Sequence, residues 1–65
     1  MNMKRFLKIV NEVLESKGYP IDIQDLPDVD FYEYFDDDFT EDEARDGAEE
    51  LVDMMIYDGD LPEFD

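Results

Sequence analysis

The chain has 65 residues, of which 21 are Asp or Glu and five are Lys or Arg, so its formal net charge is −16 at pH 7. This length predicts one small acidic domain, residues 1–65, and the absence of cysteine excludes disulfides and thiolate zinc sites. The charge excludes direct binding of nucleic acid, because phosphate repels a chain of this sign.

The first predicted element is a helix over residues 3–17. Its apolar residues recur at the i, i+3, i+4, i+7 spacing that places them on one helix face. Gly18 directly follows Lys17, which is typical of a helix that has a cation in its last turn and a left-handed glycine beyond it. The apolar face consists of Met3, Phe6, Leu7, Val10, Val13 and Leu14.

Residues 19–39 contain two prolines and satisfy two periodicities. Ile21 and Ile23 alternate with polar residues, as in a short strand, whereas the stretch from Asp30 to Phe35 is typical of a capped short helix. An isolated two-stranded ribbon is marginal in water, which favours the short helix. The sequence therefore predicts an irregular acidic-aromatic segment that contains a short helix or a β-ribbon.

A second helix is predicted over residues 41–57. Thr40 and Glu43 form a capping-box pattern, in which the Thr hydroxyl accepts from the Glu43 amide and Glu43 reaches back. Gly59 is typical of a helix end, and Pro62 forbids continuation. The apolar stripe is Ala44, Ala48, Leu51, Val52 and Met55. The expected fold is mainly α, with two amphipathic helices joined by the irregular segment.

The polar face of the second helix is acidic throughout. Projected at 100° per residue, six carboxylates fall in a sector of roughly 120° opposite the apolar stripe, with no cation on that sector. Over about 17 Å of axis they give one charge per ~3 Å, close to the ~3.4 Å between phosphates along one DNA strand. The six are Asp42, Glu43, Asp46, Glu49, Glu50 and Asp53, and Asp36, Asp37 and Asp38 extend the track before the helix.

This face has two explanations, passive solvation and a binding function. Ordinary surface helices use Glu–Lys pairs at i, i+4, each of which stabilises the helix by ~0.2–0.5 kcal/mol. Contacts such as Asp42–Asp46 are instead like-charged and costly, which favours a functional role for the acidity. Tyr32 and Tyr34 lie between acids and suit a base-stacking subsite of a partner, with packing against the first helix as the alternative.

In size and charge pattern the chain resembles the small acidic phage proteins that mimic DNA, anti-CRISPR and anti-restriction proteins among them. The resemblance extends to no shared motif. It implies a stoichiometric inhibitor, cytoplasmic in a bacterial host, that occupies the basic groove of a nucleic-acid-binding protein such as a defence nuclease. The residues expected to bind the partner are Tyr32, Tyr34, Asp36, Asp37, Asp38, Asp42, Glu43, Asp46, Glu49, Glu50 and Asp53.

The sequence offers few residues for catalysis, metal binding or membrane association. With no His, no Cys, one Ser and one Thr, the familiar nucleophile–base pairs cannot be assembled, so no enzyme activity and no cofactor are expected. A calcium loop that starts at Asp36 would place Glu41 at the turn glycine and Gly47 at the bidentate Glu, so no metal site is expected. No apolar run reaches membrane-spanning length, and no membrane association is expected.

Residues 54–57 form an apolar run that is wider than the helix stripe, so part of it belongs either to the core or to an interface. An interface would support a second hypothesis, an antitoxin or adaptor that recognises one basic protein by shape while the charges only steer. A homodimer would also stabilise a domain of this size. The contact residues of the antitoxin or adaptor would be Met54, Ile56, Tyr32 and Tyr34.

Overall fold

The computed structural model describes residues 1–26, 31–59 and 61, and regular structure in that part of the chain is helical, with no strand. Helix α1 spans Met3–Ser16 and helix α2 spans Glu41–Asp58. Two 3-10 turns lie between them, η1 at Ile23–Asp25 and η2 at Phe31–Tyr34. The predicted mainly α fold, with two helices and an irregular connection, is confirmed.

Local capping signals fix the ends of both helices. At α1 the Asn2 side chain accepts from the Arg5 amide at 2.8 Å, and Gly18 beyond the last turn has φ of 91°. At α2 the predicted capping box is present, with the Glu43 amide donating to Thr40 Oγ1 at 3.3 Å and the Thr40 amide donating to Glu43 Oε1 at 3.2 Å. Gly59 ends α2 with φ of 75°.

The connecting segment follows the helical option and not the strand option. The alternation of Ile21 and Ile23 suggested a strand, which is wrong because Ile23 begins the turn η1. The Asp22 side chain caps this turn by accepting from the Gln24 amide, and the Ile23 amide donates to Asn11 Oδ1 of α1 at 2.8 Å. The Ile23 side chain is buried in the core. Ile23 therefore connects the segment to α1 both by packing and by a hydrogen bond. The short helix between residues 30 and 35 corresponds to η2, while its expected cap, Asp30, lies outside the described residues.

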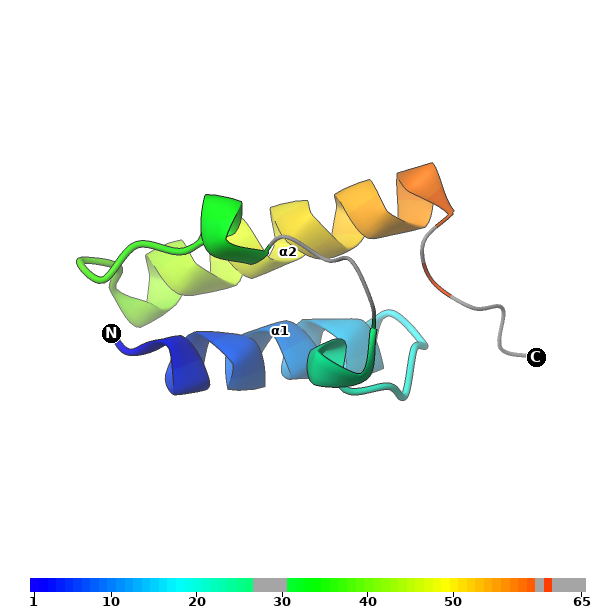
Figure 1. Ribbon diagram of the computed structural model, residues 1–65, viewed down its shortest axis with the longest axis horizontal. Coiled ribbons are helices and arrows are strands. Elements are labelled where there is room, and N and C mark those ends of the chain that lie inside the picture. Colours follow the sequence, from blue (N-terminus) through cyan, green and yellow to red (C-terminus); the bar gives the residue numbers. More distant parts are fainter. Residues whose placement is uncertain (27–30, 60, 62–65) are drawn as a thin grey trace.

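Helices α1 and α2 lie side by side and run in the same direction, so the connection returns the chain from the end of α1 to the end where α1 began (Figure 1). The core lies between them. Its α1 side includes the predicted apolar face and also Ile9, which the helical spacing did not single out, while Met3 is only partly buried. The α2 side is the predicted stripe, Ala44, Ala48, Leu51, Val52 and Met55.

Turn η2 and the segment after it pack closely onto α2 because α2 carries a glycine there. A Cβ at Gly47 would lie 3.0 Å from the carbonyl oxygen of Tyr34 and 3.5 Å from a ring carbon of Phe39. The rings of Phe35 and Phe39 in turn contact the Phe6 ring of α1, with centroids 5.4 Å and 6.5 Å apart. The segment thus packs against both helices, against α1 through its aromatic rings and against α2 through the close backbone approach at Gly47.

The substitution Gly47→Leu is expected to destabilise the protein by about 1–3 kcal/mol, the usual effect of forcing extra atoms into a packed contact. Helix propensity alone predicts the opposite sign, since Gly is ~0.8–1.0 kcal/mol worse than Ala, and Leu ranks close to Ala. Urea unfolding followed by far-UV circular dichroism measures the difference. Asp46→Leu, at the neighbouring exposed position, is the control, and a stabilised Gly47→Leu variant would contradict the close contact.

Candidate functional site

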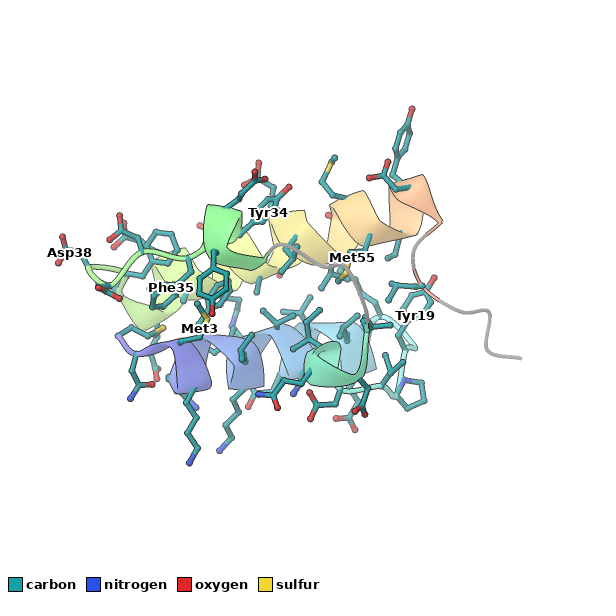
Figure 2. All side chains as sticks on the ribbon, in the orientation of Figure 1. Met3, Tyr19, Tyr34, Phe35, Asp38 and Met55 are labelled. Atoms are coloured by element: carbon teal, nitrogen blue, oxygen red, sulfur yellow. The ribbon has the colours of Figure 1, made fainter. Side chains whose placement is uncertain are left out.

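The solvent side of α2 carries carboxylates along its length. Asp42, Glu43, Asp46, Glu49, Glu50 and Asp53 are all exposed, whereas the residues on the opposite side of the helix are buried. Figure 2 shows Met55 on the side of α2 that faces α1. The helix therefore separates its functions by face, with packing toward α1 and negative charge toward solvent.

Two of these six exposed acids make contacts with other residues of the protein. Glu43 is part of the capping box, and Asp53 Oδ1 lies 3.1 Å from Lys17 Nζ of α1. A projection of α2 alone shows no cation on this face, and the Lys17 pair corrects that expectation, because the cation comes from the neighbouring helix. The remaining four make no ion pair with any described residue, and we call them the acidic ridge: Asp42, Asp46, Glu49 and Glu50.

Ion pairs occur where the two helices meet. Arg5 Nη2 lies 2.6 Å from Glu41 Oε1, and Arg45 Nη2 lies 3.3 Å from Glu12 Oε2. Together with the Lys17 pair, these ion pairs link α1 to α2 and involve three of the chain's five Lys and Arg side chains. Surface pairs of this kind are each worth about 0–1 kcal/mol. The other two basic side chains, Lys4 and Lys8, are exposed on α1, and neither makes an ion pair with a carboxylate of the acidic ridge in the described structure.

Asp36, Asp37 and Asp38 continue the acidic surface beyond the start of α2. All three are exposed, and Asp38 lies on the loop that precedes the helix (Figure 2). The Asp36 side chain accepts from the Asp38 amide at 2.9 Å, and the Asp37 carbonyl accepts from the Met1 amino group at 2.6 Å. Negative charge here also suits the positive end of the α2 dipole, so these acids have a structural role beside any binding role.

The structure separates the two tyrosines that the sequence grouped together. Tyr34 is partly buried against the core on turn η2, which contacts α2, and its carbonyl makes the close approach to Gly47 of that helix. Tyr32 is 69% exposed on η2, which contacts α2. Only Tyr32 of this pair therefore presents most of its ring to solvent.

Sequence reasoning left Tyr57 out of the candidate site, although it is the most exposed large hydrophobic residue of the described chain, at 87%. The signal was present in the helical spacing, since Tyr57 follows Asp53 by four residues and Glu50 by seven and so shares their face. The structure also divides the apolar run of residues 54–57. Met55 is buried, while Met54 and Ile56 are exposed by 45% and 38%.

Within the described ranges, no group of carboxylates is arranged to hold a metal ion. Neither helix of that part of the chain is long and apolar enough to cross a lipid bilayer. No family model, curated protein or solved structure matches the chain. The solvent side of α2 thus presents an acidic ridge without an ion-pair partner in the described part of the chain, followed by an exposed aromatic ring.

Proposed function

We propose that this protein is a non-catalytic inhibitor that presents phosphate-like charge and occupies the basic nucleic-acid-binding groove of a partner protein, such as a defence nuclease. The observation that carries the proposal is the acidic ridge, four exposed carboxylates on one helix that make no ion pair with any residue the structure describes. From Asp42 to Glu50 they span about 12 Å, or one charge per ~3–4 Å of axis. Phosphates along one DNA strand follow each other at ~3.4 Å.

The placement of the cations supports a role for the ridge. Arg5, Lys17 and Arg45 all pair with acids between the helices. The ridge itself contains the like-charged contacts Asp42–Asp46, Asp46–Glu49 and Asp46–Glu50, each of which destabilises a helix by ~0.2–0.5 kcal/mol. Fold stability alone favours a lysine at one of these positions, and its absence is explained if the carboxylates serve a partner.

The mechanism follows from charge complementarity. A groove built to hold phosphates carries Lys and Arg side chains, and an opposed row of carboxylates accelerates encounter and competes for the same cations. No bond is made or broken, so inhibition is stoichiometric. Because the attraction acts between exposed charges, it weakens when the screening length falls from ~10 Å at 0.1 M salt to ~3 Å at 1 M.

A second candidate function is an antitoxin or adaptor that recognises one basic protein by shape. The exposure of Met54 and Ile56 favours it, because both side chains are available to a contact surface. The two functions differ in salt dependence. Binding by an inhibitor that relies on charge is lost at about 0.5 M salt, whereas binding by shape persists and is lost in Met54→Ala.

The first experiment is a pull-down with the tagged protein from bacterial lysate at about 0.1 M and 0.5 M salt, at which the screening length is ~10 Å and under half of that. Captured proteins are identified and then challenged with duplex DNA. The proposal expects a nucleic-acid-binding protein that is displaced both by salt and by DNA. Capture that survives both treatments would contradict it and support the adaptor.

A charge-neutralised variant tests the ridge directly. Asp46→Asn, Glu49→Gln and Glu50→Gln together are expected to weaken inhibition of the captured protein's DNA binding by about tenfold or more, because neutralising interfacial charges near a basic groove removes at least ~1.4 kcal/mol. The control is Glu15→Gln, Asp25→Asn and Glu33→Gln, which removes the same residue types at exposed positions off the ridge. Equal inhibition by the two triple variants would show that net charge, and not the ridge, is responsible.

A further inference from the structure

The last turn of α2 carries more exposed apolar surface than its packing requires. Of the four large hydrophobic residues that are strongly exposed in the described chain, three fall at positions 54, 56 and 57. Met55 fills the core position of this turn and is almost fully buried. Polar residues at the other three positions would complete an amphipathic helix equally well, so the apolar side chains there call for a separate explanation.

Tyr57 is placed where the apolar and acidic surfaces meet. It lies one turn beyond Asp53 and two turns beyond Glu50, on the face that carries the acidic ridge, and Met54 is its neighbour at i−3. Its ring is the most exposed of the described hydrophobic side chains. The result is an aromatic face bordered by carboxylates.

We infer that Tyr57, supported by Met54, is an anchor for an arginine side chain of the basic partner. A guanidinium stacks on a tyrosine face and is attracted by its ring electrons, while its N–H groups point outward in the plane toward the carboxylate of Asp53, one turn back on the same face. A lysine ammonium is a compact, strongly hydrated charge that lacks this planar stacking. This inference rests on the proposed function and adds to it the kind of cation that the partner presents.

Charge complementarity selects a basic protein over the other candidate occupants of this surface. In a two-fold dimer the same patch faces itself, so Glu50 and Asp53 would oppose their own copies in a chain of net charge −16. Nucleic acid would bring phosphates against the same carboxylates. An arginine-bearing surface is the occupant that compensates the acids and covers the ring together.

The test measures binding of two fluorescent peptides, a nonamer of arginine and a nonamer of lysine, by anisotropy at about 0.1 M salt, where exposed charges still interact over ~10 Å. We expect Tyr57→Ala to weaken binding of the arginine peptide about three- to tenfold and to leave the lysine peptide within about twofold of wild type. Tyr57→Phe keeps the ring and is expected to keep the preference for the arginine peptide over the lysine peptide. Tyr57→Leu keeps an apolar side chain without a ring and is expected to lose it.

The outcomes separate this inference from the proposed function. Unchanged arginine-peptide binding in Tyr57→Ala, an equal loss for both peptides, or no binding of either peptide by the wild type would overturn the anchor. The ridge variant Asp46→Asn, Glu49→Gln, Glu50→Gln is expected to weaken both peptides together. Displacement by duplex DNA is measured in the pull-down, and it does not depend on the ratio of arginine-peptide to lysine-peptide affinity. The arginine anchor can therefore be confirmed even if the pull-down contradicts the nucleic-acid mimic. Tyr57 is exposed, and circular dichroism of each variant verifies the fold.

Discussion

The substitution Phe6→Ala is expected to lower the free energy of unfolding by about 3–5 kcal/mol, the usual range for removing a buried phenylalanine ring. Phe6 is fully buried on α1, and its ring contacts both Phe35 and Phe39 of the connecting segment. A domain of 65 residues has a total stability of roughly 3–10 kcal/mol. The single change therefore removes a large share of the stability, and it also releases the segment that presents Asp36, Asp37 and Asp38.

Urea unfolding measured by circular dichroism tests this expectation in a buffer of about 0.15 M salt, where the screening length is ~8 Å. Phe6→Leu retains most of the apolar volume and is expected to be less destabilised than Phe6→Ala. The exposed change Tyr57→Ala serves as the surface control and is expected to stay within about 0.5 kcal/mol of wild type. A loss below ~1 kcal/mol in Phe6→Ala would mean that the connecting segment is not held through this ring.

The helices could be predicted from the sequence because their ends are set by local chemistry. The Thr40–Glu43 box and the glycines at 18 and 59 act within one or two turns, and the structure shows the expected hydrogen bonds and left-handed φ values. Ile9 was missed because it lies at the edge of the apolar face, where burial depends on how the neighbouring elements pack. Its burial is a tertiary effect that helical spacing alone does not determine.

The connecting segment and the details of the surface depend on contacts between distant residues. Ile23 forms a turn because its amide meets Asn11 of α1 and its side chain enters the core, neither of which is visible in an alternating pattern. The six-acid face of α2 could be projected from the sequence. The pairing of Asp53 with Lys17 could not, because it requires knowing that the helices run in the same direction.

Raising the salt concentration from about 0.01 M to about 0.5 M is expected to stabilise the fold by on the order of 5 kcal/mol, because screening weakens the repulsion among like charges. The chain carries a net charge of −16, and the folded structure has a radius of gyration of 11.0 Å, against about 25 Å for an unfolded chain of this length. At 0.01 M the screening length of ~30 Å spans the folded molecule. The midpoint temperature should therefore rise by at least about 15 °C, as followed by thermal melts in circular dichroism.

The two triple variants divide this effect into a global and a local part. Both remove three negative charges, so both should reduce the salt dependence, and the ridge variant should also be the more stable of the two because it removes adjacent like-charged contacts. A midpoint that does not change with salt would contradict the repulsion. If the repulsion is confirmed, a bound basic partner should reduce it as salt does, but only at the acidic ridge. Docking then relieves repulsion that the free protein retains, and by linkage the bound partner stabilises the fold most at low salt.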